Sequence, residues 1–422
     1  MSGSAQLYMT ETPSEAPPAR APKITDLMHG RLALTPVTVL LVCVNLSVFG
    51  VMLFYGGGFW HSPNDVQVAW GAGFGPATKD GEWWRLASAM FLHFGLVHLV
   101  MNMVALVEAG RLVERLYGSG RFVVIYFASG LTGNLASLIV QGDQAIAGGA
   151  SGAVFGVYGA LLVCLWRERC QVDVTEFRWL FGGAALFTAV TIALGLFITG
   201  IDNAAHIGGL LSGALVGAVL ARRLSADSPA HNRSRWVAAI VHGLAVLVLL
   251  YRIPAPTYSW QEEKHAREEI RQFLADDKRI MERWQNILNK SRQTGASFEQ
   301  LAGEVESEIA SEYRQHLEQL SALDLDPAAP SSTTVEILRK YSQLRSEASQ
   351  ALADGLRDNN QRRIREALEM ARRAPFVARG QEPPAPVAGA GSPPRSVLDL
   401  YGNKPQIDFG QRMEKPVGPS TK

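Results

Sequence analysis

The sequence predicts an all-α polytopic membrane protein that continues into a soluble helical region, and three observations support this class. Residues 36–251 form a series of long apolar runs, whereas the chain after residue 251 is polar. The polar part repeats its apolar residues at three-to-four spacing, as amphipathic helices do. The mean hydropathy of +0.06 and the 19% of charged residues are intermediate, as expected when a membrane half and a soluble half are averaged.

Seven apolar runs approach the roughly 20 residues that a helix needs to cross a bilayer. They lie at residues 36–55, 90–110, 122–140, 151–166, 179–199, 204–221 and 236–251. The fourth and seventh runs are the shortest. A short fourth span is typical of a helix that begins inside the membrane, beside a protein-lined or water-lined cavity.

The distribution of Lys and Arg predicts the orientation of these spans. If the N-terminus is cytoplasmic, the inside segments carry thirteen basic residues between Arg20 and Arg235, and the opposite loops carry only Lys79 and Arg85. Seven spans then place residues 252–422 outside. The outer loop 56–85 holds four tryptophans, so we expect part of it to lie in the headgroup region.

Composition argues against several other classes. The 40 basic residues are balanced by 39 acidic ones, so the net charge of +1 gives no sign of a nucleic-acid-binding protein. The three cysteines, Cys43, Cys164 and Cys170, have neither C-x-x-C spacing nor a neighbouring histidine. Neither a metal site nor a disulfide framework is predicted, and no cofactor is expected.

Polar side chains within apolar spans are candidates for function, because burying each in a membrane costs a few kcal/mol unless it is paired. The second span carries His98 and Asn102, which are four residues apart and share one helix face. The fourth span opens with Ser151, and the sixth opens with His206. Taken singly, each has a purely structural explanation. Small residues such as those around Ser151 allow helices to pack closely, and a lone membrane histidine is usually a hydrogen-bonding residue.

Taken together, these residues indicate nucleophilic catalysis. A serine hydroxyl needs a base within hydrogen-bonding reach and donors aimed at the developing oxyanion. Ser151 would supply the hydroxyl and His206 the base. The free N–H groups at the start of the fourth span, with His98 and Asn102, would bind the oxyanion. Since Asp202 is the nearest acidic residue to His206 and lies in the preceding loop, we expect a dyad rather than a triad.

These residues resemble the rhomboid intramembrane serine proteases over roughly residues 36–221, with several motifs in the order and spacing of that family. The motifs are Trp84-Arg85; His93, His98 and Asn102; the stretch from Glu114 to Phe122; Gly149-Ala150-Ser151-Gly152; and Ala205-His206 with Gly209. The resemblance also places Phe155 where the family has an aromatic residue that packs on the catalytic histidine. It assigns Ser151 and His206 as catalytic and Gly149, Gly152, Phe155, Gly209, Trp84 and Arg85 as supporting residues.

The resemblance implies a six-helix catalytic core with an appended seventh transmembrane helix, which cleaves transmembrane protein substrates in the lipid bilayer near its outer face. The expected divisions are a disordered cytoplasmic tail (1–34), the core (35–221), a loop and seventh span (222–251), an extracytoplasmic helical region (252–374) and a Pro-rich disordered tail (375–422). Short loops and the lack of a targeting peptide favour a bacterial cytoplasmic membrane.

Two alternatives remain open. A proteolytically inactive rhomboid-like protein would bind membrane clients, but such relatives typically lack the serine or the histidine, and both are present here. A transporter could use membrane histidines as proton relays, but acidic residues in mid-span are missing. The family core does not explain the polar tail, whose amphipathic helices indicate substrate selection, binding of a partner, self-association or a solvated stalk.

Overall fold

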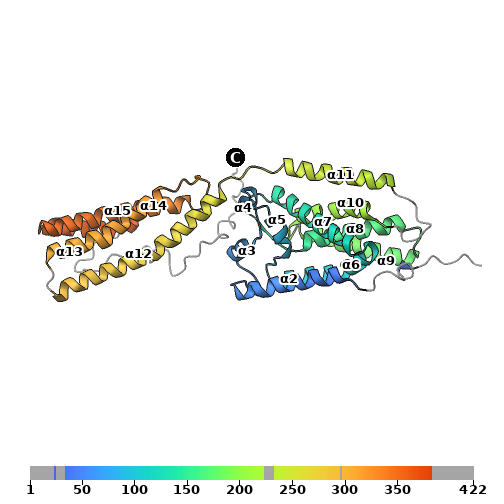
Figure 1. Cartoon of the computed structure of the whole chain (residues 1–422), viewed down its shortest axis with the longest axis horizontal. Helices are drawn as coiled ribbons and strands as arrows, with labels where there is room; N and C mark the ends of the chain where they lie inside the picture. Colours follow the sequence, from blue (N-terminus) through green and yellow to red (C-terminus); the bar gives the residue numbers. More distant parts are fainter. Residues whose placement is uncertain (1–22, 25–33, 144, 223–231, 295–296, 383–422) are drawn as a thin grey trace, which may run out of the picture. The chain divides into compact units, whose positions relative to one another are not determined.

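The computed structural model describes residues 23–24, 34–143, 145–222, 232–294 and 297–382 (Figure 1). Most of the two expected tails, 1–34 and 375–422, lies outside these ranges. The chain divides into two compact units. One comprises residues 1–73 and 84–253, and the other comprises residues 74–83 and 254–422.

Helices account for nearly all of the regular secondary structure of the described residues, as the sequence predicts. Six of them, among the described residues, are long and apolar enough to cross a membrane: α2 (Pro36–Phe54), α6 (Leu96–Tyr117), α7 (Ser119–Val140), α9 (Val174–Leu194), α10 (Asn203–Leu220) and α11 (Asn232–Tyr251). The fourth predicted span corresponds to α8 (Ser151–Glu168), which ends in Arg167 and Glu168 and is not among these six. The protein is therefore a multi-pass membrane protein.

Helix α8 lies at the centre of the first unit. It packs against α6, α7, α9 and α10, and its residues are buried along nearly the whole helix. Helices α9 and α11 bury few residues, so most of their apolar side chains are exposed. Exposed apolar helix surfaces of this kind are expected where a protein faces lipid.

The carboxylate of Glu114 on α6 fixes the start of α2. It accepts hydrogen bonds from the backbone N–H groups of Val37 (3.0 Å) and Thr38 (2.8 Å), and from the hydroxyls of Thr38 (2.7 Å) and Ser119 (2.7 Å). A carboxylate at a helix N-terminus satisfies donors that have no intrahelical partner and complements the helix dipole. Helices α2, α6 and α7 are thereby joined at one end.

The connection between α2 and α6 contains short elements only. These are α3 (Asn64–Trp70), β1 (Gly73–Phe74), α4 (Gly75–Lys79), α5 (Arg85–Ser88) and the 3-10 helix η1 (Ala89–Phe91). Strand β1 and strand β2 (Ile146–Ala147) form a two-stranded sheet. Trp60, Trp83 and Trp84 are exposed in this connection.

The second span begins later than the predicted range of 90–110. Helix α6 starts at Leu96, so His93 precedes it rather than lying within the span. The cause is Gly95, where an added Cβ would lie 2.1 Å from the carbonyl oxygen of Trp60. Only glycine permits this approach of two backbone segments, and the chain enters the helix after it.

The second unit is a bundle of amphipathic helices, as predicted from the apolar stripes at residues 270–288, 298–320 and 337–352. It contains α12 (Trp260–Thr294), α13 (Phe298–Val305), the π-helical segment η2 (Glu306–Ala310), α14 (Ser311–Ser321), α15 (Ser332–Arg357) and α16 (Gln361–Ala378). Helix α16 lies mostly within the predicted helical region 252–374 but has no counterpart among the predicted stripes, and it continues through Pro375, where the tail was expected to begin. Helix α12 contacts α13, η2 and α14, and α15 packs on α16.

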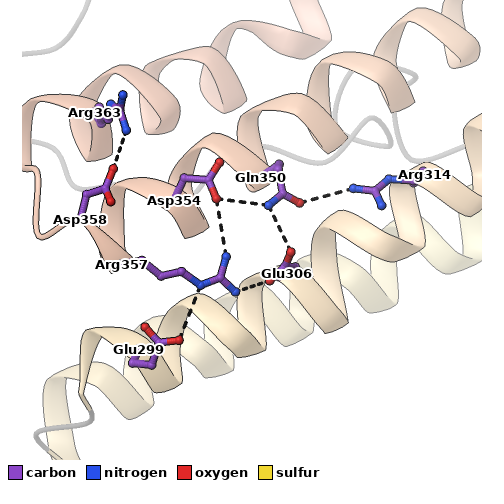
Figure 2. Close-up of polar contacts among 8 residues, drawn as sticks. All are labelled: Glu299, Glu306, Arg314, Gln350, Asp354, Arg357, Asp358 and Arg363. Atoms are coloured by element: carbon purple, nitrogen blue, oxygen red, sulfur yellow. Dashed lines mark hydrogen bonds and ion pairs between the residues drawn. The ribbon is translucent and has the colours of Figure 1, made fainter.

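Polar groups join the helices of this bundle inside and at its surface. In the core, Asp277 accepts hydrogen bonds from the hydroxyls of Tyr313 (2.7 Å) and Tyr341 (3.0 Å), which links α12, α14 and α15. At the surface, Arg357 pairs with Glu299, Glu306 and Asp354, as Figure 2 shows. The ion pair with Arg357 lowers the pKa of Glu306.

Candidate active site

Ser151 is the first residue of α8, so its backbone lies where a helix has N–H groups without intrahelical acceptors. The turn before it contains Gly149 with a φ of +132°, a conformation that favours glycine. The N–H of Gly149 donates to the carbonyl oxygen of Ala89 at 2.8 Å. Both features fix the turn that presents the Ser151 hydroxyl.

His98 lies beside this turn. A Cβ built on Gly149 would lie 2.8 Å from both Cε1 and Nε2 of His98, and 3.8 Å from Oγ of Ser151. The imidazole and the hydroxyl therefore flank the same glycine, although they belong to α6 and α8. A side chain at Gly149 would displace the imidazole, which gives this glycine a second, steric role.

The His98 ring is held between two aromatic neighbours. It makes an edge contact with His93 (5.1 Å between ring centroids) and stacks on Phe94 (6.2 Å, 20° between planes). Its Nδ1 accepts a long hydrogen bond of 3.5 Å from the N–H of Phe94. An imidazole that accepts at Nδ1 would carry its proton on Nε2, the atom next to Gly149.

Asn102 lies one turn after His98 on α6 and is buried. Its amide nitrogen donates to the carbonyl oxygen of His98 at 2.9 Å, so one of its two N–H groups is engaged within the helix. The second N–H group remains to serve another acceptor. The shared helix face of His98 and Asn102 that the sequence predicts is present.

His206 is fixed near the start of α10. The side-chain carboxylate of Asp202 accepts a hydrogen bond from the N–H of Ala205 at 3.0 Å. The backbone carbonyl oxygen of Asp202 accepts a second one from the N–H of His206. The imidazole stacks on Phe155 with ring centroids 4.3 Å apart and only 2° between planes. Its Nδ1 has no hydrogen-bond partner among the described residues.

The stacking of Phe155 places the His206 ring beside the first turn of α8, because Phe155 lies one turn after Ser151 on that helix. Ser151 and the aromatic partner of His206 therefore lie on successive turns at the same end of α8. Asp202 bonds to backbone and to Ser137. Among the described residues, neither Asp202 nor any other residue forms a hydrogen bond with Nδ1 of His206.

Glycines allow α8 and α10 to pack with their backbones nearly touching. A Cβ on Gly209 would lie 2.0 Å from the carbonyl oxygen of Gly152, and one on Gly213 would lie 2.0 Å from that of Gly156. Gly152 also packs on Ala205, the residue before His206. The small residues singled out in the sequence therefore set the distance between the helix of Ser151 and the helix of His206.

Trp84 and Arg85 contact the connection between α2 and α6 and do not touch Ser151 directly. A guanidinium nitrogen of Arg85 donates to the carbonyl oxygens of Val68 (2.7 Å) and Ala72 (3.1 Å), at the end of α3. The guanidinium also lies over the Trp84 ring, and that ring covers Gly71.

Three features of the site were not anticipated. Phe94 supports His98, Ala89 accepts from the turn before Ser151, and Gln67 donates to the carbonyl oxygen of His93 at 2.9 Å. Phe94 could have been suspected as an aromatic residue beside a histidine, but backbone acceptors leave no trace in a sequence. Within the described ranges, no group of three His, Cys, Asp or Glu residues could hold a metal ion.

Comparison with known proteins identifies a family domain. The family model for the Rhomboid domain matches residues 80–223. Rhomboid protease GluP of Bacillus subtilis (strain 168) is 34% identical over 52% of this chain and 41% of its own length. RHOMBOID-like protein 5 of Arabidopsis thaliana is 35% identical over 35% of this chain and 47% of its own length. Rhomboid-like protease 3 of Toxoplasma gondii is 28% identical over 46% of this chain and 72% of its own length. The chain thus spans less than half of the first two relatives.

Proposed function

We propose that this chain, which belongs to the rhomboid family, is a serine endopeptidase that hydrolyses peptide bonds in or near the transmembrane segments of other membrane proteins. The observation that carries the proposal is the position of the His206 imidazole. It stacks on Phe155, one helical turn from Ser151, at the N-terminus of a helix buried in the centre of the unit.

In the proposed reaction, the Ser151 hydroxyl attacks the scissile carbonyl while His206 takes its proton. The negative charge that develops on the carbonyl oxygen is stabilised by the N–H groups at the start of α8, by Nε2–H of His98 and by the free N–H of Asn102. His206 then returns the proton to the departing amine, and a water molecule hydrolyses the acyl-enzyme with the same base. The dipole of α8 favours the oxyanion at this helix end.

The proposed substrates are transmembrane segments, because the site lies among membrane-spanning helices. A helical substrate hides its carbonyls in hydrogen bonds, so cleavage requires a segment whose helix opens easily near the bond. The lipid bilayer is the surrounding medium, and water reaches Ser151 from the outer side.

The proposed orientation places the N-terminus in the cytoplasm and the C-terminal unit outside a bacterial cytoplasmic membrane, as the positive charges of the loops indicate. A reporter that works only outside the cytoplasm should be active when fused after Pro256 and inactive when fused after Arg223. Equal behaviour of the two fusions would contradict this orientation.

The deciding experiment for the activity is labelling of the purified full chain with a fluorophosphonate, together with cleavage of a model transmembrane substrate. Ser151→Ala and His206→Ala should each abolish both signals, and the double variant should be no worse than either single one, because the two residues act as a unit. Ser47→Ala, at an exposed serine of α2, is the matched control and should behave as wild type.

Failure of the wild-type chain to cleave or label would favour the alternative, an inactive rhomboid-like protein that binds membrane clients. The presence of both Ser151 and His206, and their convergence at α8, argues for the protease.

A further inference from the structure

Residues 74–83, within the connection between α2 and α6, belong to the C-terminal unit, although the chain on both sides of them belongs to the membrane unit. Three contacts of different kinds hold them at the first turns of α12. The ring of Phe74 packs edge-on against Trp260, with centroids 5.2 Å apart. The carboxylate of Asp80 accepts a hydrogen bond from the N–H of Gln261 at 3.0 Å, and Lys264 pairs with Glu82 at 2.7 Å.

These contacts match the chemistry of a helix start. The N–H of Gln261 is one of the first donors of α12, which have no acceptor within the helix, and Asp80 supplies one. A negative charge at that end also complements the dipole of the 35-residue helix. We call residues 74–83 the clamped segment.

The residues of α12 that contact the clamped segment are themselves held by other residues of the helical bundle. Trp260 is buried, and the guanidinium of Arg267 lies 5.2 Å from its ring. Arg267 pairs with the buried carboxylate of Glu263, which also accepts hydrogen bonds from the N–H (3.1 Å) and hydroxyl (2.9 Å) of Ser331. The start of α12 is thus tied to the segment that leads into α15.

The other end of the clamped segment leads directly to the proposed active site. Trp84 and Arg85 follow it, and Arg85 begins α5 and bonds to the carbonyl oxygens of Val68 and Ala72. Helix α5 continues into η1, where the carbonyl oxygen of Ala89 accepts the N–H of Gly149. Gly149 lies two residues before Ser151.

We propose that the C-terminal helical unit positions the active site through the clamped segment. Trp260, Gln261 and Lys264 are positioning residues that hold residues 74–83 and thereby restrain α5, η1 and the turn before Ser151. A partner that binds the bundle and disturbs the start of α12 would change the rate at the site. The role in catalysis depends on the proposed protease function, but the clamp itself can be tested without it.

The test uses the full chain and a charge exchange. Lys264→Glu places two negative charges together at Glu82, and Glu82→Lys places two positive charges together at Lys264. The double variant restores an ion pair with the charges exchanged. Arg271→Glu is the matched control, because Arg271 pairs with Glu268 on the same helix and that pair lies outside the clamp. The rate of hydrogen exchange in residues 74–91 measures how firmly the clamped segment is held. The rates of fluorophosphonate labelling and substrate cleavage measure the activity of the proposed active site.

Each single variant should speed hydrogen exchange in residues 74–91 and lower labelling and kcat by about two- to five-fold, since one partly exposed ion pair contributes up to about 1 kcal/mol. The double variant should recover wild-type exchange and rate, and Arg271→Glu should match wild type. Unchanged exchange in Lys264→Glu would overturn the clamp. Faster exchange with wild-type labelling and kcat would overturn the positioning role. A wild-type chain that never labels would overturn the protease function and, with it, the positioning role, while the exchange data would still test the clamp.

Discussion

Substitution of Gly209 by alanine tests whether backbone contact between α8 and α10 sets the geometry of the proposed dyad. The added Cβ would lie 2.0 Å from the carbonyl oxygen, 2.8 Å from the carbonyl carbon and 3.2 Å from Cα of Gly152. All three are backbone atoms, so no side chain can rotate away. Ordinary contact begins at 3.4 Å, and the helices must therefore separate by about 1.4 Å at this point.

That displacement acts on both catalytic residues, because Gly152 follows Ser151 and Gly209 lies one turn after His206. A misplacement of about 1 Å can cost roughly 10²-fold in rate, so we expect kcat of Gly209→Ala to fall by about that factor. The assay is cleavage of a model transmembrane substrate by purified protein, with the fluorophosphonate labelling rate as a second measure. Gly243→Ala on α11 is the control, since nothing lies within 4 Å of its added Cβ. A folded Gly209→Ala variant with wild-type kcat would refute the reasoning.

Two further predictions concern the oxyanion and the C-terminal unit. His98→Ala and Asn102→Ala should each lower kcat by about 10² to 10³ with little change in KM, because an oxyanion donor acts mainly in the transition state; steady-state kinetics in which only KM rises would contradict the assignment. Burial lowers the pKa of His316, against the opposing influence of Glu312, Asp277, Glu269 and the neighbouring Asp276, so the folded unit binds this proton less readily than the unfolded chain. Its stability should be greatest above about pH 6.5 and fall below it. Pulse proteolysis in urea should give a lower midpoint at pH 5.5 than at pH 7.5, and a smaller difference in His316→Gln; an equal or higher wild-type midpoint at pH 5.5 would contradict the prediction.

The sequence was sufficient for the helices of the membrane unit, because length and hydropathy are properties of each span by itself. It was not sufficient for their ends. The start of α6 depends on the approach of Gly95 to Trp60, two residues that are far apart in the chain. Helix α16 escaped notice because it is rich in arginine and buries mainly alanines, which give a weak apolar stripe.

The candidate site was predictable as far as its side chains carry distinctive chemistry. Ser151, His98 and His206 stand out as polar residues in apolar spans, and Phe155 was expected from the family resemblance. The contribution of the clamped segment could not be predicted, because an amphipathic stripe on α12 shows that the helix has a partner without showing which one. The contacts of Asp80 and Glu82 with α12 join residues about 180 positions apart, and no local pattern records such a pair.

The clamped segment also bears on how the chain crosses the membrane. Asp80 and Gln261 share a hydrogen bond, so the clamped segment and the start of α12 lie on the same side of the bilayer. Between Trp84 and Ile253 the described residues contain six helices of 18 residues or more, α6 to α11. Six crossings return the chain to its starting side, whereas five would not. Helix α8 is not among those that hydropathy alone selects, yet it must cross the membrane if the other five do. In the proposed orientation, the end of α8 with Arg167 and Glu168 lies on the cytoplasmic side, and the end with Ser151 lies on the same side as the clamped segment.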